Sequence, residues 1–168
     1  MHGRGSTQGL IAEQLARDPM LVERRQMLRR TLRGLSDLQL EALATGLERH
    51  EEQLIAGRLF KSTGGGGCAV GVMLRELEAV PSRGTAAFWL RDRWRRSVTS
   101  YGEMRRQPRL RHLEWGFDAA VELLRGGGVK REEAVTTVGR WLRQLAGYEL
   151  AWRAQSRSFA TTSEAVAA

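Results

Sequence analysis

Residues 18–40 read DPMLVERRQMLRRTLRGLSDLQL, and this stretch contains the signals that decide the fold. The Asp-Pro pair at its start is typical of a helix N-terminus, because aspartate caps the first N–H groups and proline fits the first turn. Apolar residues then recur at helical spacing as far as Gly34. Ser36 and Gln39 have the spacing of a capping box. The stretch therefore predicts two successive helices joined by a short turn.

Helical spacing continues on both sides of this stretch. The helix that begins at Ser36 is expected to run to about Leu59, and a weaker helix is expected over residues 8–17. A short helix is expected after the glycine run, with a strand as the alternative because Val70 and Val72 favour extended backbone. Three further helices are expected over residues 85–100, 108–126 and 130–156.

Together these elements predict an all-α protein, a single-domain bundle of five to seven short helices with a Gly-rich break near residue 65. A chain of 168 residues is long enough to close one hydrophobic core without disulfides. The domain is expected to span residues 7–159. Residues 1–6 are expected to form a frayed N-terminal tail and residues 160–168 a disordered C-terminal tail.

The composition excludes several classes of protein. Apolar residues make up 42% of the chain and charged residues 27%, as in ordinary globular domains. No apolar run approaches the roughly 18 residues of a transmembrane helix, and no secretory signal is evident, so a cytoplasmic protein is expected. The single cysteine excludes an intramolecular disulfide.

The formal net charge of +8 is concentrated in one segment. Residues 83–112 contain nine basic and two acidic residues, and arginines alternate there with Trp89, Trp94 and Tyr101. Arginine binds phosphates in a bidentate manner and aromatic rings stack on bases. The alternative is a solvated helix face with both tryptophans turned into the core. The predicted polyanion-binding residues are Arg91, Arg93, Arg95, Arg96, Arg105, Arg106, Arg109 and Arg111.

The run GGGGC at residues 64–68 suggests a different chemistry. A helix that starts at Cys68 would lower the pKa of the thiol and favour a nucleophilic thiolate. A thiol enzyme also needs a base, for which His50 is preferred and His112 is the other internal histidine. The alternative is a flexible linker followed by a buried structural cysteine. The N–H groups of an anion-binding loop would come from Gly64, Gly65, Gly66 and Gly67.

Three glutamates, Glu51, Glu114 and Glu149, fall on apolar faces of the predicted helices. A di-iron bundle would need Glu-x-x-His pairs, which the sequence lacks, so no metal and no cofactor is expected. We instead predict that these glutamates pair with arginines such as Arg58 at the boundary of the core.

The leading functional prediction is a non-enzymatic binding or regulatory module that engages nucleic acid or an acidic protein through the arginines of residues 91–111. The first alternative is a thiol-dependent enzyme, or a site for an anionic ligand, centred on Cys68. The second is a structural subunit that forms a homo-oligomer through its aromatic helix faces. A membrane partner is not expected.

Overall fold

The first two described helices begin where the sequence signals predict. The structure is a computed structural model that describes residues 17–57, 67–79 and 108–167. Helix α2 spans Pro19–Arg33, and the carboxylate of its N-cap, Asp18, accepts a hydrogen bond of 2.8 Å from the N–H of Met20. Helix α3 spans Asp37–Arg49. Its capping box is complete, because the Ser36 hydroxyl accepts from the N–H of Gln39 and the Gln39 side chain accepts from the N–H of Ser36.

Helix α3 is shorter than predicted, and its expected end near Leu59 is wrong. The helix stops at Arg49 and is followed by a single 3₁₀ turn, η1, over Glu51–Gln53. Leu54 then forms an isolated bridge with Gly67, and its side chain packs into the core with 8% of its surface exposed. Tertiary packing therefore overrides the helical spacing of the sequence at this point.

The remaining described helices are α4 (Ala69–Ala79), α7 (Pro108–Gly126) and α8 (Arg131–Ala167). The helical prediction for α4 is confirmed over the strand alternative. Helix α8 extends well past its predicted end at Ser156, so that end is wrong, and it runs to Ala167 through most of the segment expected to be a tail. The physical reason is that no glycine or proline follows Gly147, so nothing in the sequence ends the helix.

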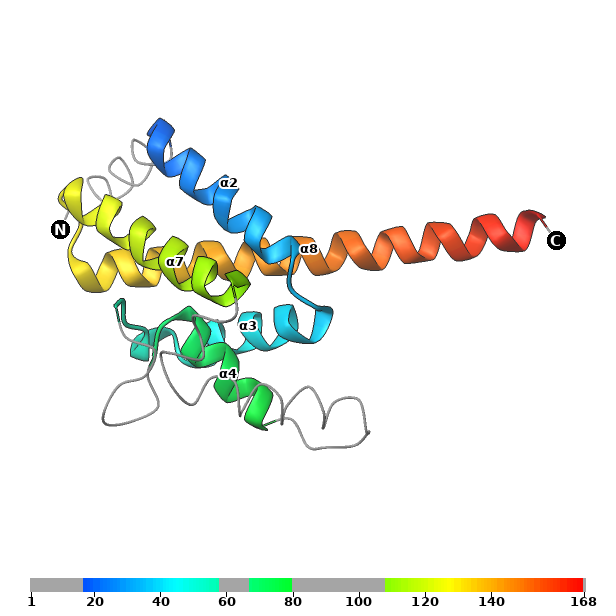
Figure 1. Cartoon of the computed structure of the whole chain (residues 1–168), viewed down its shortest axis with the longest axis horizontal. Coiled ribbons are helices and arrows are strands. Elements are labelled where there is room, and N and C mark those ends of the chain that lie inside the picture. Colours follow the sequence, from blue (N-terminus) through cyan, green and yellow to red (C-terminus); the bar gives the residue numbers. More distant parts are fainter. Residues whose placement is uncertain (1–16, 58–66, 80–107, 168) are drawn as a thin grey trace, which may run out of the picture.

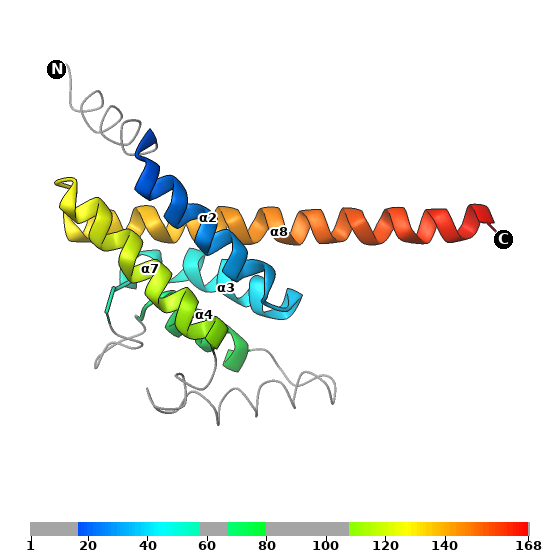
Figure 2. The same ribbon diagram turned by 45° about the horizontal axis from the view of Figure 1, so that its top comes forward.

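Helix α8 is the longest described helix, and α2, α3 and α7 all contact it. Figures 1 and 2 show its first half crossed by α2 and α7, with α3 and α4 on another side, while its second half extends past all of them. The all-α fold is confirmed for the described residues. The helices expected over residues 8–17 and 85–100, and the break near residue 65, lie outside the described residues.

One hydrophobic core joins the five α-helices of the described ranges. Its fully buried side chains include Leu28 of α2, Leu43 of α3, Met73 of α4, Phe117 of α7 and Leu142 of α8. None of the described helices has both the length and the apolar character needed to cross a membrane.

Candidate functional site

Two of the three predicted glutamate–arginine pairs are present. Glu51 forms an ion pair with Arg140 of α8. Glu149, which is 7% exposed, lies 3.1 Å from Nε of Arg153 and 3.9 Å from Nε of Arg33. The prediction is confirmed for these two glutamates. Arg58, the partner suggested from the sequence, lies outside the described residues.

Glu114 is the exception, and the prediction of an arginine partner is wrong for it. The residue is 4% exposed, and its Oε2 atom has no hydrogen-bond partner among the described residues. Burial, followed by repulsion from Asp118, raises the pKa of the Glu114 carboxyl to about 7. The apolar face of α7 thus buries a carboxyl group that is largely protonated below neutral pH.

Asp118, one helical turn after Glu114, belongs to the same cluster. Its carboxylate accepts a hydrogen bond of 2.9 Å from the N–H of Gly57, and burial raises the pKa of Asp118. The spacing of four residues places both carboxyls on one face of α7, and this signal in the sequence could have identified Asp118. Within the described ranges, no three His, Cys, Asp or Glu side chains are grouped so that they could hold a metal ion.

Cys68 directly precedes α4, as predicted, but its surroundings oppose ionisation. Its side chain is fully buried, and burial raises the pKa of the thiol to about 12, although N–H groups of α4 act in the opposite direction. The negative charges of Glu114 and Asp118 raise this pKa further. The thiol is therefore protonated at neutral pH. The thiol-enzyme alternative stays a prediction that this geometry does not favour.

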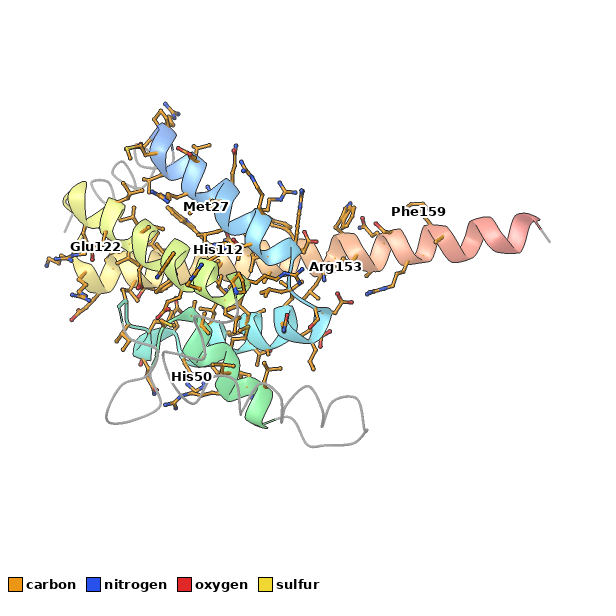
Figure 3. All side chains as sticks on the ribbon, in the orientation of Figure 1. Met27, His50, His112, Glu122, Arg153 and Phe159 are labelled. Atoms are coloured by element: carbon orange, nitrogen blue, oxygen red, sulfur yellow. The ribbon has the colours of Figure 1, made fainter. Side chains whose placement is uncertain are left out.

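The two histidines considered as bases lie on different elements, as Figure 3 shows. Nε2 of His50, at the end of α3, lies 3.3 Å from a carboxylate oxygen of Glu76. His112 is exposed on α7. Of the predicted anion loop, Gly67 is buried and its carbonyl accepts from the N–H of Ile55, while Gly64, Gly65 and Gly66 lie outside the described residues.

Only the end of the predicted arginine segment is described. Arg109 is exposed, and its Nη1 donates a hydrogen bond of 2.6 Å to the carbonyl of Gly34, the C-cap of α2. The guanidinium of Arg111 lies 4.8 Å from the ring centre of Trp115. The end of this segment thus lies against the C-terminal end of α2. The other predicted residues, Arg91, Arg93, Arg95, Arg96, Arg105 and Arg106, lie outside the described residues.

Helix α2 is itself strongly basic, with five arginines and one glutamate. Arg29, Arg30, Arg33 and Arg109 are all exposed and surround the C-terminal half of α2; we call these four residues the arginine patch. Their only carboxylate neighbour among the described residues is Glu149, at 3.9 Å from Arg33. The sequence prediction did not include the α2 arginines as site residues, although the basic excess of this helix is visible in the sequence.

Several arginines elsewhere on the described surface are neutralised. Arg49 lies 2.9 Å from Glu76, Arg143 lies 3.5 Å from Glu48, and Arg125 lies 2.9 Å from Glu122. The arginine patch differs from them because its positive charge is almost uncompensated by described residues. An uncompensated cluster of exposed guanidinium groups attracts phosphate or carboxylate groups of a partner.

Comparison with known proteins finds no family model that matches the chain, and no curated protein or solved structure that is significantly similar to it.

Proposed function

We propose that this protein is a non-enzymatic binding module that engages a polyanionic partner through the arginine patch. The observation that supports this proposal is a contrast between two groups of exposed arginines. Arg29 and Arg30 form no ion pair with any described residue, whereas Arg125 and Arg143 each have a glutamate within 3.5 Å. Guanidinium groups that no described carboxylate neutralises are available to an external one.

The hydrogen bond between Arg109 and Gly34 extends the proposal to the segment predicted from the sequence. Arg109 belongs to that segment and contacts the end of α2. The arginines of residues 91–106 come shortly before Arg109 in the sequence. The same proposal includes a regulatory role, in which the module acts by occupying its partner, and the cytoplasmic location expected from the sequence.

The test is a titration with a generic DNA duplex and a generic single strand at two salt concentrations. The variant Arg29→Gln with Arg30→Gln removes two charges without breaking a described ion pair. Affinity for both probes should fall, and the dependence of log K on log salt should flatten by about one unit for each phosphate that the variant no longer binds.

The matched control is Arg125→Gln with Arg143→Gln, which removes the same charge from arginines outside the patch. Its salt dependence should remain that of the wild type, because these guanidinium groups are already paired with Glu122 and Glu48. Absence of binding at low salt, or an equal effect of both double variants, would contradict the proposal.

A further inference from the structure

Helix α8 carries a row of exposed aromatic side chains. Tyr148 is 71% exposed, Trp152 is 63% exposed and Phe159 is 77% exposed. At about 100° per residue, these three positions fall within an arc of about 40° on the helix surface. We call these residues the aromatic row. Figure 3 shows Phe159 on the part of α8 that extends past the other helices.

In the first half of α8, which packs in the bundle, an arginine from α2 covers this same face of the helix. Trp141 lies on the same arc as the aromatic row and is half-buried. The guanidinium of Arg25, from α2, lies 5.1 Å from the centre of the Trp141 ring. A guanidinium group therefore stacks on an aromatic ring of this face at Trp141, inside the bundle.

The end of the aromatic row at Tyr148 lies beside the arginine patch. Arg25 contacts Trp141 and Arg33 contacts Glu149, so the two contacts are eight residues apart on both helices. Arg29 is midway between Arg25 and Arg33 on α2. Trp141, which Arg25 contacts, and Tyr148 lie on the same arc of α8, so Tyr148 is on the side of α8 that α2 approaches.

We infer that this combined surface binds single-stranded nucleic acid, an inference that rests on the proposed function. The arginine patch would bind phosphates, and the rings of Tyr148 and Trp152 would stack on unpaired bases. Every base has a π-face, so this recognition would be tolerant of sequence. The faces of bases in a duplex are already stacked on each other. An acidic protein would occupy the arginines but offers no such faces to the rings.

The test uses the full chain and three probes: a fluorescent oligothymidine of about 12 nucleotides, a duplex of the same length, and inorganic polyphosphate as a polyanion without bases. The variant Tyr148→Ala with Trp152→Ala should weaken oligothymidine binding by roughly 5- to 150-fold for each base that is no longer stacked. It should leave polyphosphate affinity within about twofold, because it removes no charge. The control Met20→Ala removes an exposed apolar side chain from the N-terminal end of α2, outside the arginine patch and the aromatic row, and should change neither affinity.

The outcomes separate the inference from the proposed function. Unchanged oligothymidine binding by the Tyr148/Trp152 variant, with polyphosphate still bound, would overturn the inference alone. Equal affinity of the wild type for the duplex and the single strand would do the same. The wild type could also be a dimer that does not bind the single strand, and the double variant a monomer. That result would overturn the inference and assign the aromatic row to an interface between copies of the chain. Binding of no polyanion at low salt would overturn both.

Discussion

Arg153 of α8 donates a hydrogen bond of 2.8 Å to the carboxylate of Asp37 at the start of α3. The same guanidinium also donates to the carbonyl of Leu35, in the turn between α2 and α3, at 2.9 Å, and to the carbonyl of Arg33, the last residue of α2, at 3.0 Å. These carbonyls lie at or just beyond the end of α2, where backbone acceptors lack partners within the helix. Arg153 therefore fixes the arginine patch relative to the aromatic row.

Replacement of Arg153 by Ala should lower the free energy of unfolding by about 2–4 kcal/mol, because Glu149 and two carbonyls lose charge-assisted hydrogen bonds. Chemical denaturation measures this decrease. Arg157→Ala removes the other guanidinium that binds Asp37 from an exposed position, and should cost less than about 1 kcal/mol. Equal decreases in the two variants would contradict the role assigned to Arg153.

The buried carboxyl of Glu114 should make stability depend on pH. Its pKa is raised from 4.5 to about 7 in the folded protein, so the folded state binds a proton more tightly than the unfolded state. Stability should therefore fall as pH rises from about 4.5 to about 7. Glu114→Gln, which stays neutral, should remove this fall and be the more stable protein above pH 7, by up to about 3 kcal/mol.

Denaturant unfolding at pH 5 and pH 8 measures this effect. The control Glu122→Gln changes an exposed carboxylate on the same helix and should keep the wild-type pH profile. A Glu114→Gln protein that loses stability equally at both pH values would show that the carboxyl is not protonated in the fold.

Replacement of glycine by alanine should have opposite effects on stability at Gly46 and at Gly147. A Cβ atom at Gly46 would lie 2.6 Å from the carbonyl oxygen of Val72, where α3 and α4 approach each other, whereas Gly147 has nothing within 4 Å. Gly46→Ala should destabilise the protein by about 1–3 kcal/mol through overpacking. Gly147→Ala should stabilise it by about 0.5–1 kcal/mol through helix propensity. Thermal unfolding of both variants tests the close approach of α3 and α4.

Cys68 should react slowly with an alkylating reagent in the native protein. Burial blocks access and raises the pKa of its thiol to about 12, so alkylation at pH 8 should be at least about tenfold slower than in denaturant. The chain has one cysteine, so the measured rate belongs to it alone. Rapid native alkylation with an apparent pKa below about 8.5 would favour the thiol-enzyme prediction, and His50→Ala would be measured next.

Local signals in the sequence were sufficient for most of the described helices. Asp18 with Pro19, and Ser36 with Gln39, act through hydrogen bonds and dihedral preferences within one helical turn, so their effect can be read without knowledge of the fold. That Glu51 and Glu149 have arginine partners could be predicted without knowing which arginines, because a carboxylate that stays ionised on an apolar face needs a charged partner.

By itself, the sequence determined that this chain is helical, since capping residues and helical spacing act over a few neighbouring positions. It did not determine where α3 ends. The helix stops at Arg49, and Leu54, which the helical spacing had placed in it, packs instead against Gly139 of α8. Only the tertiary structure decided which of the described arginines have a carboxylate partner, and that the end of the aromatic row at Tyr148 lies beside α2. These features depend on packing between helices far apart in the sequence, and no local propensity encodes such packing.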